Sequence, residues 1–190
     1  RVFFASDSAL YCIGKKGNQS SHSERSAAAA GSNVSSNPAT FVQVVPTELI
    51  LKPGDKANFR ARLFDAQGNF IREETAANWS LEQLKGTVEN GHFTAANDAV
   101  AQAGMVKATV GDISGTATVR VFPPLPWSET FDSFTVDAPP PTWVNVATKF
   151  NVQDLEGKKV LAKLTTGSSL QSRAGAYMGP SDWSNYTIES

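Results

Sequence analysis

Residues 105–121, MVKATVGDISGTATVRV, decide the fold of this 190-residue chain. Apolar and polar residues alternate on both sides of Gly111-Asp112. Because successive side chains of a β-strand point to opposite faces, this alternation predicts a hairpin of two strands with a tight turn. The apolar set is expected to face the core: Val106, Ala108, Val110, Ala117, Val119 and Val121. The polar set is expected to face water: Lys107, Thr109, Thr116, Thr118 and Arg120.

Similar strand patterns fill residues 40–122 at short intervals. Strands are expected at 41–45, 48–51, 57–63, 70–71, 77–81, 86–88 and 92–95. Turn signals rich in Gly, Asp and Asn separate them, at 53–55, 65–69 and 89–91. Short strands at this spacing, without helical periodicity, predict an all-β chain with a β-sandwich at residues 40–122.

The sequence on either side of the sandwich divides into four shorter segments. Residues 1–16 hold strand patterns at 2–5 and 9–13, with turn residues between them. Residues 17–39 have the Ser, Asn, Gly and Ala composition of a flexible linker. The Pro-rich joint PPLP at 123–126 should end the sandwich, because proline cannot donate to a ladder. Residues 127–190 open a new strand pattern, with its last strand expected at 185–189.

Bulk composition excludes several function classes. A net charge of -1 gives no electrostatic reason to expect nucleic acid or an anionic membrane as a partner. No apolar run approaches the ~20 residues that cross a bilayer, so direct membrane insertion is not expected. The single cysteine, Cys12, excludes an internal disulfide and is expected to be a small buried strand residue. Arg1 opens directly into strand-like sequence, which predicts that the chain is a fragment of a longer protein.

The middle of the chain carries a recognisable set of motifs. These are Pro46, LKPGD at 51–55, FDAQGN at 64–69, Trp79-Ser80, NGHFTA at 90–95 and the closing hairpin. With these motifs, residues 41–122 resemble bacterial Ig-like domains of the group 2 type, although residues 82–89 depart from the usual Asn-Pro insertion. The resemblance implies an Ig-like β-sandwich that acts as a spacer or adhesion module of a secreted or surface protein, without the antibody-type disulfide.

The two ends of the chain carry further resemblances. VFFAS at 2–6 and LYCIG at 10–14 look like the terminal hairpin of a PQQ-like β-propeller, a class in which many members bind no quinone. ETFD at 129–132, PTW at 141–143, KVL at 159–161 and DWSNYTIE at 182–189 are similar to the N-terminal part of a concanavalin-like jelly roll. Folds related to this jelly roll bind sugars or cleave glycosidic bonds.

Residues that could carry catalysis or hold a metal are sparse. The two histidines, His22 and His92, have no second His or Cys at ligand spacing, so no metal site is expected. No nucleophile elbow or phosphate-binding loop occurs. Glycosidases need two carboxylates, but the pairs at 129/132 and 154/156 flank strands or turns and are expected to be solvated. Glu189 carries no positive sign of catalysis, so neither a catalytic residue nor a cofactor is predicted.

Four aromatic side chains are candidates for binding a sugar. They are Trp143, Tyr177, Trp183 and Tyr186. Aromatic faces offer a large apolar area that can stack on sugar rings. Core packing is the favoured alternative for all four, and Trp79 is expected to fill the core between the sheets.

The sequence therefore predicts a non-catalytic spacer or binding segment of a larger bacterial multidomain protein. The family resemblances imply a secreted, periplasmic or cell-surface location, with carbohydrate or a cell-surface polymer as the expected partner. Two alternatives stay open. One is a carbohydrate-binding module, and the other is a fragment of a quinoprotein-like or glycosidase-like enzyme whose active residues lie outside this chain.

Overall fold

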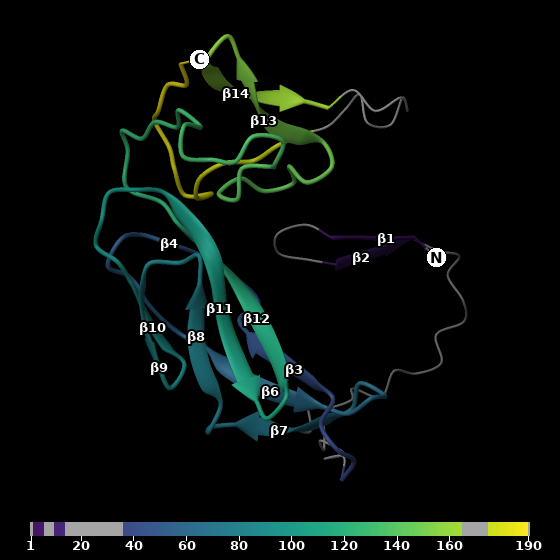
Figure 1. Ribbon diagram of the computed structural model, residues 1–190. Coiled ribbons are helices and arrows are strands. Elements are labelled where there is room, and N and C mark those ends of the chain that lie inside the picture. The colour runs from purple at the N-terminus through teal and green to yellow at the C-terminus, as the bar shows by residue number, and fades with distance from the viewer. Residues whose placement is uncertain (1, 6–9, 14–35, 165–174, 190) are drawn as a thin grey trace. The chain divides into compact units, whose positions relative to one another are not determined.

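The structure is a computed structural model that describes residues 2–5, 10–13, 36–164 and 175–189 (Figure 1). Within these residues the secondary structure consists of β-strands, without any helix, which confirms the predicted all-β class. The chain forms two compact units, Arg1–Ser32 and Asn33–Ser190. Each unit is considered by itself below.

The first unit contains one hairpin. Strands β1 (Val2–Ala5) and β2 (Leu10–Ile13) pair antiparallel, with Val2 opposite Ile13 and Ala5 opposite Leu10. Both strands were predicted from the sequence. The turn residues predicted at 6–8, and all of the predicted linker except residues 36–39, lie outside the described residues.

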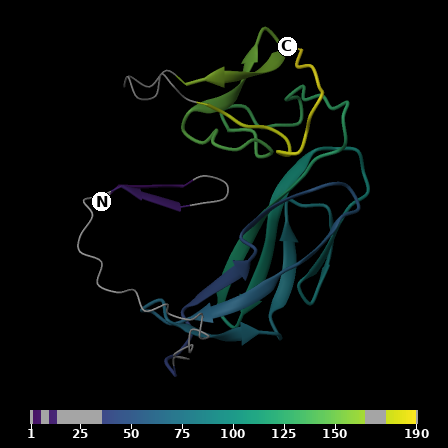
Figure 2. The same ribbon diagram turned by 180° about the vertical axis from the view of Figure 1, so that it is seen from behind.

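The second unit is built around a β-sandwich (Figures 1 and 2). One layer is a four-stranded sheet in the order β4-β12-β11-β8, made of β4 (Glu48–Leu51), β8 (Asn78–Glu82), β11 (Gln102–Val110) and β12 (Ile113–Val121). The other layer contains two three-stranded sheets. The first, in the order β3-β6-β7, is made of β3 (Phe41–Val45), β6 (Arg60–Phe64) and β7 (Phe70–Glu74). The second, in the order β5-β10-β9, is made of β5 (Lys56–Asn58), β9 (Gly86–Glu89) and β10 (His92–Ala95).

The two sheets of the second layer share one extended segment. The strand expected at 57–63 is broken at Phe59 into β5 and β6, and the two pieces pair with different partners. The Phe59 amide donates to the Gly91 carbonyl across 2.7 Å instead of joining a ladder. Both layers send apolar side chains into one core, which includes Val44, Leu63 and Phe93 opposite Val106 and Val119. The predicted β-sandwich architecture is thereby confirmed.

The hairpin of residues 105–121 forms as predicted. Its register places Val110 opposite Ile113, with Gly111 at the first central position of the turn at φ 58°. Five of the six apolar residues expected in the core are at most 1% exposed, and Val110 is half-buried against the core. The polar face of this hairpin, which was expected to be exposed to water, is only partly exposed. Lys107 is half-buried and pairs with Glu82 at 2.9 Å, and Arg120 is covered as described below.

The turn at 65–69 is organised by a buried carboxylate. Asp65 is 0% exposed and accepts hydrogen bonds from the amides of Gln67 at 3.0 Å and Asn69 at 2.9 Å. The side-chain amides of Asn69 and Asn37 also donate to it, each at 3.1 Å. Asp65 therefore ties the β6–β7 turn to the segment that precedes β3, a long-range link that the local turn signal did not predict.

The chain changes layers between β3 and β4. β3 pairs antiparallel with β6, whereas β4 pairs in parallel with β12, so that Glu48 lies opposite Thr118 and Leu51 opposite Val121. The amides of Thr118 and Phe122 donate to the carbonyls of Thr47 and Leu51, both at 2.9 Å. The strand that follows the layer change is thus bonded to the last strand of the sandwich.

Gly115 marks a close approach of β12 to β3. A Cβ atom at this position would lie 2.0 Å from the Val42 carbonyl oxygen and 2.8 Å from the Val42 carbonyl carbon. Only glycine leaves room for another backbone at this distance.

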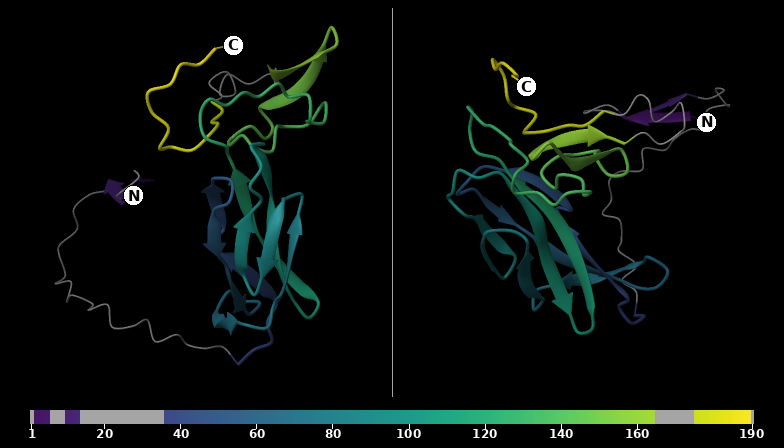
Figure 3. Two further views of the ribbon diagram at one scale, coloured as in Figure 1. Left: turned by 90° about the vertical axis from the view of Figure 1, so that its left-hand side faces the viewer. Right: turned by 45° about the horizontal axis from the view of Figure 1, so that its top comes forward.

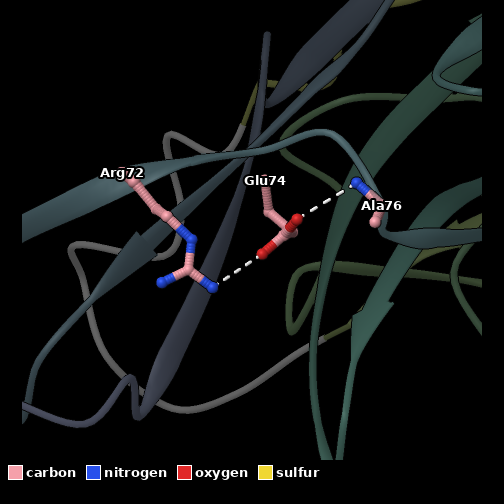
Figure 4. A network of polar contacts seen from close by, with 3 residues as sticks. All are labelled: Arg72, Glu74 and Ala76. Atoms are coloured by element: carbon pink, nitrogen blue, oxygen red, sulfur yellow. Dashed lines mark hydrogen bonds and ion pairs between the residues drawn. The ribbon is translucent and has the colours of Figure 1, made fainter.

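An ion pair stabilises the end of β7 (Figure 4). The Arg72 guanidinium donates to Glu74 at 2.8 Å, and the Ala76 amide donates to the same carboxylate at 3.1 Å. The hydrogen bond from Arg72, followed by the one from Ala76, holds the pKa of Glu74 below its ordinary value of 4.5. The Glu74 side chain is 14% exposed, whereas that of Arg72 is 59% exposed.

Glu74 is expected to make stability depend on pH. A folded-state pKa below the unfolded value contributes stability that is present above pH 4.5 and is lost as the pH falls through the folded pKa. In urea unfolding, Glu74→Gln should cost on the order of 0.5 kcal/mol near neutral pH and nothing at acid pH. Arg72→Met should remove most of this difference. An equal cost of Glu74→Gln at every pH would contradict the assignment.

The C-terminal part of the second unit holds one more hairpin (Figure 3). Strands β13 (Phe150–Leu155) and β14 (Lys158–Lys163) pair antiparallel around a turn in which Glu156 and Gly157 both have positive φ. A single bridge joins Val144 to Tyr177. The buried residues of this part are Pro140, Thr142, Val146 and Val152.

The strand expected at 185–189 does not form, and the expectation was wrong. Asn185 has a φ of 56°, which turns the backbone out of the extended conformation. The Tyr186 ring lies against Trp183, at 6.5 Å between centroids, and residues 185–189 pair with no strand in the described part of the chain. Alternation alone does not make a strand when no neighbouring strand is available.

Candidate functional site

The end of β12 leads into a buried junction. Phe122 directly follows β12 and is 1% exposed. Its backbone amide donates a hydrogen bond to the Leu51 carbonyl. Pro123 is also buried, whereas residues 124–126 are exposed. The Pro-rich joint predicted at 123–126 therefore begins inside the packed end of the sandwich.

Three aromatic rings meet at this junction, and we call them the aromatic clamp: Phe122, Trp127 and Trp183. The Phe122 ring lies 5.5 Å from Trp127 and 5.9 Å from Trp183, both edge to face. The two indoles lie 5.7 Å apart at an angle of 45°. Such pairs contribute about 0.5–1.5 kcal/mol beyond the apolar area that they bury. The clamp joins residues at the end of the sandwich to a residue far along the chain.

Gly179 provides the seat for Trp183. Its φ is 75°, and a Cβ atom there would lie 2.2 Å from the six-membered ring of Trp183. The indole is therefore packed directly over the Gly179 backbone. This contact and those with Phe122 and Trp127 place Trp183 in a packed cluster and leave its ring faces little room for a sugar.

Trp143 belongs to a second aromatic group. Its ring lies 5.7 Å from Phe131, which in turn lies 6.2 Å from Phe134. The Trp143 Nε1 atom is buried without a hydrogen-bond partner. Another part of the indole lines an open cavity of about 360 Å³, together with Arg120, Asn145, Val146, Ala147 and Pro139–Pro141.

Tyr177 and Tyr186 are the exposed candidates. Their side chains are 66% and 52% exposed, respectively. The backbone of Tyr177 is fixed by its bridge to Val144, with hydrogen bonds of 2.8 and 3.0 Å. Its ring does not line the cavity beside Trp143. Of the four sequence-predicted candidates, Trp183 and Tyr186 contact each other at 6.5 Å, whereas Trp143 packs on Phe131 and the Tyr177 ring is exposed. The four rings therefore do not form one stacking platform.

Arg120 connects the sandwich to the C-terminal part. Its side chain is only 13% exposed, although the alternation placed it on the wet face. Its guanidinium donates to the Glu48 carboxylate and, across 3.3 Å, to the Pro141 carbonyl. The strand pattern did not indicate this connecting role of Arg120, because the Pro141 carbonyl that it contacts lies beyond the Pro-rich joint.

The carboxylates considered for catalysis are spread over a loop, the end of β13, the β13–β14 turn and the C-terminal segment. Glu129 accepts a hydrogen bond from the Phe131 amide at 3.0 Å, and burial raises its pKa above the ordinary value of 4.5. The Asp132 charge adds to this shift, against the opposing backbone hydrogen bonds. Asp154 accepts from the Gly157 amide at 2.8 Å in the β13–β14 turn, where Glu156 is also exposed. Glu189 is exposed as well.

The histidine candidates give no ligand cluster. His92 contacts Asn58 through Nδ1 at 2.7 Å across the exposed face of β5 and β10, and His22 lies outside the described residues. Over the described ranges, no three His, Cys, Asp or Glu side chains gather closely enough to hold a metal ion. In the same ranges no helix has the length and apolar character needed to span a membrane.

Comparison with known proteins adds no further identification. No protein-family model matches the chain, and a search of curated proteins finds none that is similar to it.

Proposed function

We propose that this chain is a non-catalytic spacer that holds flanking parts of a larger protein at a fixed distance and resists tension. The observation that supports this role best is the parallel pairing of β4 with β12. The chain enters this pair at Glu48 and leaves it at Val121, at opposite ends of the paired segment. A pull on the two ends of the sandwich therefore runs along the strands and loads all of their hydrogen bonds together.

The family resemblances along the chain extend this proposal. The Ig-like character of residues 41–122 and the propeller-like hairpin of residues 2–13 favour a large secreted, periplasmic or cell-surface bacterial protein. The jelly-roll-like region favours contact with carbohydrate or a cell-surface polymer. In this proposal the chain makes and breaks no bond and needs no cofactor. Measurable turnover of a glycoside or alcohol substrate by the chain would contradict this proposal.

The proposal is tested by pulling the full chain from its ends in a single-molecule force experiment. Leu49→Pro should lower the unfolding force of the sandwich, because the carbonyls of Thr47 and Leu51 face β12 and the Leu49 amide must face it too. Proline removes this donor, which costs about 1 kcal/mol of pairing or more.

Ile50→Pro is the matched control for this experiment. The Ile50 amide points away from β12, and β4 is an edge strand, a place where proline is tolerated. Leu49→Ala controls for the lost side chain. Equal unfolding forces for Leu49→Pro and Ile50→Pro would contradict the proposal that the β4–β12 hydrogen bonds resist the applied force.

Carbohydrate binding is the second candidate function, and the cavity beside Trp143 favours it. An indole, a guanidinium and an amide line a space of about 360 Å³, near the lower limit of small-molecule pockets. Glycan binding that Trp143→Ala abolishes, at an unchanged unfolding midpoint, would support this function. Loss of folding in the same variant would assign Trp143 to the core.

A further inference from the structure

The junction after β12 is covered by a segment from the other end of the second unit. Residues 179–186, which we call the strap, carry Trp183 onto Phe122 and Trp127. Without the strap, the buried Phe122 ring would lose one of its two aromatic neighbours. Exposure of this apolar surface would be unfavourable, so the closed arrangement is the stable one.

Within the strap, the backbone of Gly179 fixes the position of the Trp183 ring. Gly179 and Trp183 are four residues apart, and the indole lies where the glycine has no side chain. The left-handed φ of Gly179 makes the turn that brings the ring back over the backbone. Tyr186 closes the outer side of Trp183 at 6.5 Å. The half-buried indole thus contacts its own segment as well as the junction.

Two further contacts join the sandwich to the C-terminal part away from the clamp. Lys52 pairs with Asp182 of the strap at 3.5 Å, beside a small cavity that Leu51 and Pro180 also line. Both partners of this pair are more than half exposed, so it orients the strap more than it stabilises it. The second contact is the bond from Arg120 to the Pro141 carbonyl. A rotation about the Pro-rich joint would have to break these contacts together with the clamp.

We infer that the strap locks the Pro-rich joint, so that the sandwich and the described residues 127–164 and 175–189 move as one rigid body. The aromatic clamp is the lock, and its release would convert the joint into a hinge. This inference is independent of the mechanical role proposed for the β4–β12 pair, because it concerns the contact between the strap and the end of the sandwich at Phe122. It adds to the spacer a device that sets the direction in which the C-terminal region is presented.

The test is backbone ¹⁵N relaxation of the full chain, which reports the rotational correlation time of each region. In the native protein, amides of β11 and β12 and amides of β13 and β14 should give the same correlation time. Trp183→Ala should separate the two values, with faster tumbling of β13 and β14. Tyr177→Ala is the matched control, because this exposed ring contacts no other aromatic ring in the described part of the chain.

A spectroscopic signature tests the clamp itself. Two indoles 5.7 Å apart should give an exciton couplet in the far-ultraviolet circular dichroism spectrum. Trp127→Phe and Trp183→Phe should each abolish the couplet but keep the shared correlation time, because a phenyl ring still packs on Phe122. Trp143→Phe should leave the couplet unchanged.

Several outcomes would overturn the inference. Different correlation times of the two regions in the native protein would show that the joint is already a hinge. A shared correlation time in Trp183→Ala would show that the strap is not the lock. If Trp183→Ala unfolds the C-terminal hairpin, Gly179→Ala replaces it, since the added methyl group displaces the ring without removing it. A folded Gly179→Ala variant that loses the couplet but keeps the shared correlation time would also reject the lock.

Discussion

Replacing Gly115 with alanine is expected to lower the free energy of unfolding by about 3 kcal/mol. The added Cβ atom would lie 2.0 Å from the Val42 carbonyl oxygen, far inside the van der Waals distance. The obstacle is backbone and not the flexible end of a side chain, so relief requires a shift of β3 or β12. Val42 is paired with Leu63 of β6, and a shift of β3 would therefore disturb that ladder as well.

This prediction is checked by urea unfolding followed by tryptophan fluorescence. Ser114→Ala is the first control, because Ser114 is the preceding, exposed residue of β12. Gly111→Ala is the second control. Its position has open space but a φ of 58°, so only the conformational cost of about 1 kcal/mol is expected. A Gly115→Ala variant as stable as Ser114→Ala would show that β3 and β12 do not approach as closely as described.

Asp65→Ala is expected to lower the free energy of unfolding by a similar amount, about 3 kcal/mol. The substitution removes a fully buried carboxylate that accepts hydrogen bonds from the amides of Gln67 and Asn69 and from the side chains of Asn69 and Asn37. Hydrogen bonds to charged groups contribute about 1.5–3 kcal/mol each, although amides that regain water recover part of this. The amides of Gln67 and Asn69 would lose an acceptor within the β6–β7 turn.

Asp55 offers a matched control for Asp65. It also accepts a bond from a nearby backbone amide, that of Lys52 at 2.9 Å, but it does so in an exposed turn. Asp55→Ala should cost about 1 kcal/mol or less, because water can replace the acceptor. Asp65→Asn should be intermediate, since one acceptor oxygen remains. Equal effects of the two alanine variants in denaturant unfolding would refute the role given to burial.

Local patterns were sufficient to predict most strands of the sandwich. The alternation at 105–121 gave the correct hairpin because adjacent strands with a two-residue turn need only local information. The break at Phe59 was not predictable, because residues 57–63 alternate without interruption. It arises where the chain passes from one partner strand to another.

At the candidate site, contacts between residues far apart in sequence determine side-chain burial and backbone conformation, and local patterns do not predict such contacts. Arg120 has a polar position in the strand pattern, which predicts exposure to water. In the structure its guanidinium instead donates to the Pro141 carbonyl and the Glu48 carboxylate, both distant in sequence. Trp183 and Tyr186 lie in a strand-like pattern, but ring packing at the junction decides their conformation. Apolar alternation does not reveal whether a partner strand or an aromatic cluster receives the side chains.

The parallel pairing of β4 with β12 also sets the order in which the sandwich can be completed. Arg120 and Glu48 meet across the outer face of this pair although they are 72 residues apart in sequence. During synthesis from the N-terminus, β4 has no sheet to join until its partner, the last strand of the sandwich, has emerged. Closure of such a long loop is entropically costly, and folds dominated by non-local pairing form slowly. The nascent sandwich would therefore remain open, with an unpaired strand edge, until its final residues are available.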